Sequence, residues 1–206
     1  MGSGIPLSST LPKTRCVAVK ALQSGQTLLD RYVLTAFLGT GAGGETWQAD
    51  GPRGPVAIKV VRAGTDLSVG SFQDLIREAG VLRTLRSPHI VEYLEFSDRP
   101  HEGCAFLVTA LVPGGNLAKH IREHGAYETR AVARLGLQLV MALEALHGAN
   151  ILHRDLKPHN VLVSPRTDDD PLLQVTDFGI SRRAVHGVVD TIDRKLSPAY
   201  ASPEQY

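Results

Sequence analysis

A short polar run between two apolar segments carries residue types suited to phosphoryl transfer. In "ILHRDLKPHNVLV" (151–163), Asp155, Lys157 and Asn160 follow one another at steps of two and three. A carboxylate can accept the proton of a hydroxyl nucleophile, an ammonium can neutralise a transferring phosphoryl group, and an amide oxygen can bind Mg²⁺. Asp177 in "TDFG" adds a hard oxygen ligand seventeen positions after Asn160. A locally bonded turn would explain either motif alone, but such a turn does not require all of these residues in this order.

A lysine and a glutamate occupy positions where apolar residues are expected. Lys59 lies in "VAIKVV", a β-branched segment that should face a core, and Glu78 falls on the apolar side of a helix predicted at 71–85. Each alone could be a charged side chain that reaches the surface. A buried carboxylate without a partner is strongly destabilising. We therefore expect each to be the counter-ion of the other, with the ammonium also able to hold a phosphate.

Glycines crowd one turn between predicted strands. Gly39, Gly41, Gly43 and Gly44 all lie in "GTGAGGETW". Such a turn lets backbone N–H groups approach an anion closely, although a flexible hairpin turn would look the same. No helix begins directly after these glycines and no Gly-Lys-Ser/Thr is present, which excludes the dinucleotide-binding and nucleoside-triphosphatase loops. A hairpin that covers phosphates remains.

The elements that must position these residues follow from hydrophobic periodicity. Five strands and one helix are expected in the first part, with "YVLTAFLG", "PVAIKVV", "HIVEYLEF" and "CAFLVTALV" among the strands. The helix is expected to be capped by Ser71. Its apolar stripe is Phe72, Leu75, Ala79 and Leu82.

The second part of the chain is predicted to be mainly helical. A long amphipathic helix, ending near 147–148, is indicated by Val132, Leu135, Leu139, Leu143 and Leu146. The polar run of 151–163 follows, then a short strand "LLQVT", and residues 180–206 are expected to form a long loop. Residues 1–29, rich in Ser, Thr, Pro and Gly, are expected to be a flexible tail.

Composition narrows the class of protein. The 206 residues are 43% hydrophobic and 21% charged, with a formal net charge of +1. These values are typical of a globular protein and do not indicate nucleic acid as a partner. Cys16 and Cys104 show no disulfide or metal-ligand spacing. Neither a signal peptide nor a membrane-spanning run is evident, so we expect a cytoplasmic protein.

These motifs resemble those of eukaryotic-type serine/threonine protein kinases, a family also widespread in bacteria. The matching elements occur in family order from Tyr32 to Tyr206: "GTGAGG", "VAIK", the helix glutamate, "HRDLKPHN", "DFG" and "SPAYASPE". The resemblance implies a two-lobed α+β fold, with a five-stranded lobe bearing one helix at 30–111. The residues 112–206 would form part of a helical lobe.

The resemblance also implies roles for individual residues. Asp155 would orient the substrate hydroxyl and accept its proton, and Lys157 would contact the γ-phosphate. Lys59, paired with Glu78, would hold the α- and β-phosphates of ATP. The residues expected to hold Mg²⁺ are Asn160 and Asp177. Those expected to surround the nucleotide are Gly39, Thr40, Gly41, Gly44, Thr46, Ala57, Lys59, Thr109, Ala110, Val112 and Leu162.

The resemblance extends to regulation. Arg154 beside the catalytic aspartate is typical of kinases that are activated by a phosphate in the loop after "DFG". Thr191 is the expected autophosphorylation site, whereas Ser197 stands where the family has a structural hydroxyl. The expected substrate is a protein serine or threonine.

The sequence departs from the family pattern at several points. Thr46 replaces a branched apolar residue expected against the adenine, Gly43 replaces an aromatic residue, and Leu196 replaces a glycine. The chain ends at Tyr206, where the family continues into further helices. We therefore expect an incomplete lobe, which a partner or a further chain segment would cover. A fragment, a truncated gene product and one part of an assembly all remain open.

Two functional alternatives remain beside the kinase. One is a catalytically inactive fragment that binds a nucleotide or a partner, which the incomplete lobe favours and the intact Lys59, Asp155 and Asp177 oppose. The other is a phosphotransferase for small molecules, which rarely combines "HRDLKPxN" with a "PE" segment. Phosphate transfer from ATP to protein is the favoured function.

Overall fold

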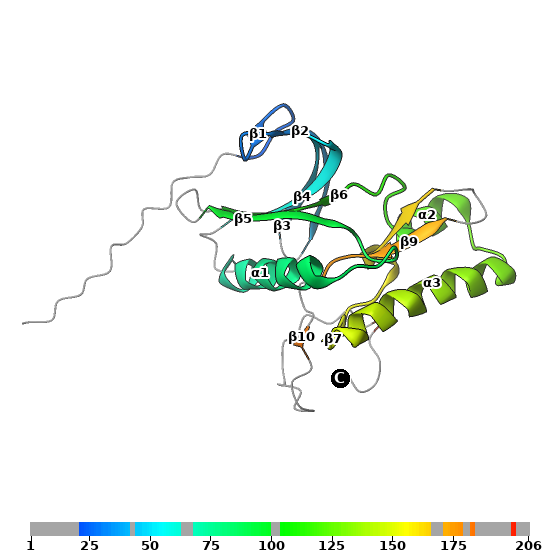
Figure 1. Cartoon of the computed structure of the whole chain (residues 1–206). Helices are drawn as coiled ribbons and strands as arrows, with labels where there is room; N and C mark the ends of the chain where they lie inside the picture. Colours follow the sequence, from blue (N-terminus) through cyan, green and yellow to red (C-terminus); the bar gives the residue numbers. More distant parts are fainter. Residues whose placement is uncertain are drawn as a thin grey trace, which may run out of the picture.

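The computed structural model describes residues 21–41, 44–62, 68–99, 104–165, 171–178, 182–183 and 199–200. A curled antiparallel sheet with helix α1 beside it precedes a second part built around α3 (Figure 1). The elements of the first part are β1 (Thr27–Leu28), β2 (Tyr32–Gly41), β3 (Gly44–Gly51), β4 (Gly54–Arg62), α1 (Ser68–Thr84), β5 (Tyr93–Arg99) and β6 (Cys104–Ala110). Those of the second are α2 (Leu117–His124), α3 (Thr129–Gly148), β7 (Ile151–Leu152), the 3₁₀ turn η1 (Pro158–Asn160), β8 (Val161–Ser164), β9 (Leu172–Val175) and β10 (Arg182–Arg183).

The sheet confirms the expected α+β architecture and adds one short strand. Its strand order is β1-β2-β3-β4-β6-β5, and the expected number of five strands matches β2 to β6. The four segments named from the sequence overlap β2, β4, β5 and β6, and β3 was not among them. The glycine turn joins β2 to β3, so β3 lies between the first two strands that the sequence analysis named. The extra strand, β1, pairs with β2, and both Leu22, which precedes it, and Leu28, its second residue, are buried. Residues 21–29, expected in the tail, therefore pack against the sheet, because their leucines bury apolar surface there.

Strand register separates the two faces of the sheet. Gly39 pairs with Thr46, Thr46 with Lys59, and Lys59 with Leu107, so these residues form one row across four strands. Side chains alternate along a strand, so Ala57 shares the face of Lys59. The opposite face packs into a separate apolar cluster that includes Leu34, Trp47, Ala49, Val56, Ile58, Val60, Phe106 and Val108.

Helix α1 covers the face of the sheet that carries Lys59. Its buried stripe contains Leu75, Ala79 and Leu82, as expected. The helix begins at Ser68, so Ser71 lies inside it and is not the cap. The side chain of Phe72 lies outside the described residues.

Helix α3 packs against the β8–β9 hairpin in the second part of the protein (Figure 1). Its buried stripe is Ala131, Leu135, Ala142 and Leu146. Val132, expected on this stripe, is instead 54% exposed. The burial of Ala131 and Leu135, one turn apart, places Val132 about 100° around the helix from the core. Leu135 and Leu146 are buried as expected, and Leu139 and Leu143 are partly buried against the core, whereas Ala131 and Ala142 are buried residues that a search for large apolar side chains misses.

One apolar core joins the two parts. Leu75 and Leu82 of α1 belong to the same buried cluster as Leu146 of α3, Val175 of β9 and Phe178. Such a shared core holds the strand and helix ends that carry polar side chains in fixed relative positions. Among the described helices, none is long and apolar enough to cross a membrane.

Gly44 is the glycine of the β2–β3 hairpin whose replacement we expect to be most damaging. A Cβ atom there would lie 2.1 Å from the carbonyl oxygen of Val60, and the φ angle is +133°. We predict that Gly44→Ala lowers the free energy of unfolding by about 1–3 kcal/mol or more.

The matched control is Gly80→Ala on the exposed side of α1. A Cβ atom at Gly80 meets no atom within 4 Å, so the alanine should stabilise the helix by about 0.5–1 kcal/mol. Urea unfolding followed by circular dichroism measures both effects. Equal changes in the two variants would contradict the close approach at Gly44.

Candidate active site

A partly buried lysine links three elements of the fold. The Nζ atom of Lys59 on β4 lies 2.8 Å from Oε2 of Glu78 on α1 and 2.6 Å from Oδ1 of Asp177, just after β9. The expected pair of Lys59 and Glu78 is therefore present. The contact between Lys59 and Asp177 was not foreseen, because the two residues are 118 positions apart. The three side chains carry one positive and two negative charges.

The three charged side chains of this cluster shift one another's pKa values. Burial favours a lower pKa for Lys59, but the carboxylates of Glu78 and Asp177 outweigh it and raise the pKa above its usual value. Burial raises the pKa of Glu78, an effect that the Lys59 ammonium only partly offsets. The pKa of Asp177 is lowered: burial opposes this, and the attraction of Lys59 overcomes it. Lys59 therefore stays charged near neutral pH.

Phe178 and His153 support this cluster, and the sequence analysis assigned neither a role. Phe178 is fully buried, its backbone N–H donates to Oε1 of Glu78 at 3.3 Å, and its ring lies 5.2 Å from that of His153. The signal that could have found Phe178 is its position directly after Asp177, at the end of a buried strand. A phenylalanine there fixes the direction of the preceding carboxylate.

Asp155 is the centre of the polar turn. Its Oδ2 atom accepts from Nζ of Lys157 at 2.7 Å and from Nδ2 of Asn160 at 3.0 Å. Nδ2 of Asn160 also donates to the backbone carbonyl of Asp155 at 2.8 Å. The carboxylate of Asp155, the ammonium of Lys157 and the amide of Asn160, which the sequence places close together, thus contact one another within one turn.

His153 ties this turn to the chain after β9. Its Nδ1 accepts from the backbone N–H of Asp155 at 3.3 Å, so Nε2 carries the proton and donates to the carbonyl of Thr176 at 3.0 Å. Burial lowers the pKa of His153 below its usual value. The neutral imidazole therefore bridges the loop of Asp155 and the segment of Asp177.

Two non-glycine residues next to these groups have left-handed backbones. Arg154 has a φ angle of +66° and Asp177 of +67°. Such conformations are unfavourable for residues with a Cβ atom and persist only where surrounding contacts impose them. Here the hydrogen bonds of His153 and the pair with Lys59 impose them. The strain coincides with the charged cluster.

The β8–β9 hairpin brings together the two oxygen donors expected to hold Mg²⁺. Val161 pairs with Val175, so Asn160 and Asp177 flank the same end of the hairpin. The backbone N–H of Thr176 donates to the carbonyl of Asn160 at 3.0 Å. Both amide hydrogens of Asn160 are directed at Asp155, which leaves its side-chain oxygen as a ligand. An amide and a carboxylate oxygen suit a hard cation.

One face of the sheet presents most of the residues expected around a nucleotide. The β3–β4 and β4–β6 registers pair Thr46 with Lys59 and Ala57 with Thr109, so these four side chains share a face. Gly39, Thr40, Gly41 and Gly44 form the hairpin beside them, and Gly43 lies outside the described residues.

The segment after β6 supplies the remaining expected contacts. The backbone N–H of Ala110 donates to the carbonyl of Glu92 at 3.0 Å. Ala110 can therefore contact an adenine base only through its carbonyl oxygen. Its expected role in holding the nucleotide is limited to that of a hydrogen-bond acceptor. The side chain of Val112 is buried, and Leu162 of β8 packs against the same core. Gly114 continues the segment against β8, where a Cβ atom would lie 2.2 Å from the carbonyl oxygen of Val163.

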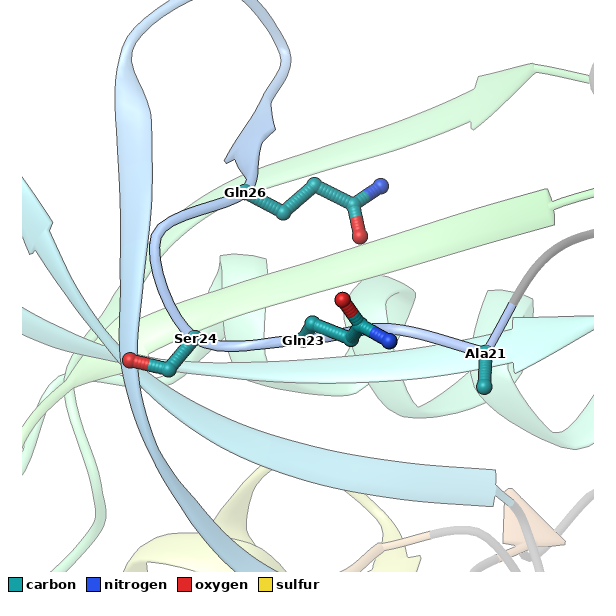
Figure 2. Close-up of a pocket in the computed structure, with 4 residues that line it drawn as sticks. All are labelled: Ala21, Gln23, Ser24 and Gln26. Carbon is teal, nitrogen blue, oxygen red and sulfur yellow. The ribbon is translucent and has the colours of Figure 1, made fainter.

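A separate pocket lies along the segment before β1. Figure 2 shows its lining residues, Ala21, Gln23, Ser24 and Gln26. None carries a charge, and Oγ of Ser24 donates to the carbonyl of Thr35 at 2.9 Å. The pocket shares no residue with the Lys59 cluster and offers no activated nucleophile.

Comparison with known proteins agrees with this arrangement. Residues 32–205 match the family described as "Protein kinase domain". The chain belongs to the protein kinase domain family. It is 36% identical over 180 residues to calcium/calmodulin-dependent protein kinase type 1 of Macrobrachium nipponense, covering 85% of this chain and 50% of that protein.

Other relatives are similarly distant and also longer. Serine/threonine-protein kinase ULK3 of Xenopus laevis is 35% identical, with 85% of this chain and 37% of the relative covered. Serine/threonine-protein kinase pkn3 of Myxococcus xanthus is 30% identical, with 88% and 34% covered. The chain thus spans half or less of the length of these curated relatives.

The neutral His153 predicts a pH dependence of stability. Because its pKa is lowered in the folded state, the unfolded chain binds more protons at acidic pH. This contribution to stability is present above the usual histidine pKa near 6.5 and is lost as pH falls through the lower folded value. We expect the free energy of unfolding to fall more steeply between pH 7.5 and 5 in the wild-type chain than in His153→Gln.

Urea unfolding at several pH values measures this difference. The control is His147→Gln, because His147 is exposed at the end of α3. This variant should retain the wild-type pH dependence. A His153→Gln chain with the same slope as wild type would refute the argument.

Proposed function

We propose that this chain binds Mg·ATP and transfers its γ-phosphate to serine or threonine hydroxyls of proteins. The observation that carries the proposal is the joining of Lys59, Glu78 and Asp177 next to the loop of Asp155. Membership of the protein kinase domain family supports it. Two of the relatives are named serine/threonine-protein kinases, which supports serine and threonine hydroxyls as the acceptors of the phosphate.

ATP would lie between the sheet face and the catalytic loop. The Lys59 ammonium would contact the α- and β-phosphates, and Glu78 would hold that ammonium in place. Ala57 and Leu162 would contact the two sides of the adenine, with Thr109 behind it. The backbone N–H of Val112, in the segment after β6, would donate to the base.

Asn160 and Asp177 would hold Mg²⁺. Among the described residues, no group of three or more histidine, cysteine or acidic side chains could hold a metal ion. A Mg²⁺ site typically takes one or two protein ligands, and phosphates and water complete its coordination. When bound, the cation neutralises charge that develops on the phosphates.

Asp155 would act on the incoming hydroxyl. Its carboxylate would orient the substrate and accept the hydroxyl proton as the new P–O bond forms and the bond to the β-phosphate oxygen breaks. Lys157, 2.7 Å from this carboxylate, would neutralise charge on the transferred group. The hydrogen bond from His153 to Thr176 keeps the loop aligned with the Asp177 segment.

Nucleotide or partner binding without turnover is the second candidate. The exposed apolar side chains Leu137, Val140 and Met141 on α3 favour it, because such a surface is usually covered. Regulation by a phosphate at Thr191 is a further proposal, and that residue lies outside the described ones. Mass spectrometry of ATP-treated chain should detect the phosphate at Thr191.

The first test measures transfer from γ-labelled Mg·ATP to the chain itself and to a generic basic protein. We expect Asp155→Asn to lower the transfer rate by at least about 100-fold, because the general base is lost. Its affinity for Mg·ATP, measured by calorimetry, should stay close to that of wild type. Transfer that survives in Asp155→Asn would contradict the assigned base. Binding without transfer in wild type would favour the second candidate.

The second test concerns the nucleotide site alone. Lys59→Met removes the cation of the cluster, so we expect Mg·ATP affinity to fall by about 10- to 100-fold, the loss of one charge-assisted contact. Lys119→Met is the matched control, because Lys119 is exposed on α2. It should bind Mg·ATP as wild type does. A folded wild-type chain that fails to bind Mg·ATP would overturn the proposed function.

A further inference from the structure

Helix α3 carries a polar residue on its packed side that the proposed catalytic machinery does not use. Gln138 lies among apolar neighbours in "LGLQLVM" (135–141), and its side chain is half-buried. The helix packs against strand β9 (Figure 1). A polar side chain in such a position requires hydrogen-bond partners.

The amide of Gln138 binds the backbone of β9 at two points. Its Nε2 atom donates to the carbonyl of Pro171 at 3.0 Å, and its Oε1 atom accepts from the backbone N–H of Leu173 at 2.8 Å. A residue of a parallel neighbouring strand would bind in the same way, to a carbonyl and an N–H two residues apart. The side chain therefore takes the place of one strand residue along this edge of β9.

The segment after α1 completes the same edge. The backbone N–H of Val175 donates to the carbonyl of His89 at 2.9 Å, and the carbonyl of Val175 accepts from the N–H of Val91 at 3.0 Å. Nδ1 of His89 lies 3.2 Å from the carbonyl of Leu173, to which it can only donate. The opposite edge of β9 pairs with β8. Gln138 thus holds the beginning of the edge, and residues 89–91 hold its end.

The direction of Asp177 depends on how β9 is held. Asp177 follows the last residue of β9 by two positions and has a left-handed backbone. Without the amide of Gln138, the N–H of the buried Leu173 would lose its acceptor. A buried N–H without a partner is unfavourable, so the strand would have to shift or rotate. Because β9 has four residues, a shift at Leu173 would reach Asp177.

We propose that Gln138 is a positioning residue, which fixes β9 so that the carboxylate of Asp177 and the amide oxygen of Asn160 meet the same Mg²⁺ ion. This inference rests on the proposed function, because it takes Asp177 as a ligand of Mg²⁺. Gln138 acts through the backbone of β9 and not on the nucleotide. Its loss should therefore weaken the contribution of the metal to nucleotide binding more than nucleotide binding itself.

The first test measures the affinity of the whole chain for ATP by calorimetry, once with Mg²⁺ and once with a chelator. The ratio of the two affinities is the gain that the metal provides. Gln138→Met keeps the length of the side chain and loses both hydrogen bonds. We expect it to reduce this gain by about tenfold, the effect of removing a partner that orients a metal ligand. The affinity without metal should stay that of wild type.

The matched control is Ala131→Gly on the same helix. Ala131 is buried on α3, and glycine lowers the stability of a helix without removing a hydrogen bond to β9. This variant should keep the wild-type gain from Mg²⁺. Equal losses in the two variants would show a general effect of destabilisation and would overturn the positioning role.

The second test is hydrogen exchange without metal or nucleotide, followed by nuclear magnetic resonance. The N–H of Thr176 donates to the carbonyl of Asn160, and that of Phe178 to Oε1 of Glu78. We expect both amides to exchange about tenfold faster in Gln138→Met and at the wild-type rate in Ala131→Gly.

The two tests separate this inference from the proposed function. A wild-type chain that gains no affinity from Mg²⁺ would overturn the proposed function, and the exchange rates would then decide the positioning role alone. Wild-type exchange at Thr176 and Phe178 in Gln138→Met would overturn the positioning role whatever the chain binds.

Discussion

The arrangement of this protein depends on the charge balance at Lys59. The buried carboxylate of Glu78 requires a counter-ion, and the partly buried Lys59 supplies it while also pairing with Asp177 beyond a distant hairpin. Leaving one member of a buried ion pair without its partner costs about 3–5 kcal/mol. The triad therefore couples the position of α1 and of the segment after β9 to the sheet. Since its net charge is negative, it also favours a cation nearby, in keeping with the proposed Mg²⁺ site.

The sheet separates a face that carries Lys59 from an apolar face. Alternation along β4 directs Ala57 and Lys59 to one side and Ile58 and Val60 to the other, where they pack in the core. Antiparallel register then adds Thr46 to the first side. Because a slip of one residue would exchange the two faces, burial of the apolar side holds the polar side in place.

The second part of the protein contributes its polar groups from one end of a hairpin. Hairpin β8–β9 has buried valines on one side, and it carries Asn160 and Asp177 at one end. Neutral His153 and buried Phe178 connect this end to Asp155 and Glu78. The backbone strain at Asp177 is tolerated because contacts on both sides of it are fixed. Apolar packing thus supports the polar cluster from beneath.

Much of the site was predictable from local pattern. Lys59 in a β-branched strand and Glu78 on an apolar stripe required partners, and their pairing followed from the high free energy of isolated buried charges. The order of the motifs along the chain indicated that Lys157, Asn160 and Asp177 lie near Asp155. Four of the five long strands and the two main helices were also predictable, because apolar periodicity reflects which side of each element is buried.

The sequence by itself determined the residue types of the site, the order of the elements and the pairing of Lys59 with Glu78. Only the tertiary structure decided that Asp177 shares Lys59, that Leu22 and Leu28 extend the sheet's core, that Val132 faces solvent, and that the side chain of Gln138 binds the edge of β9. The physical reason is the range of the interactions. Periodicity reports burial along one element, whereas these contacts depend on how separate elements and loops pack together.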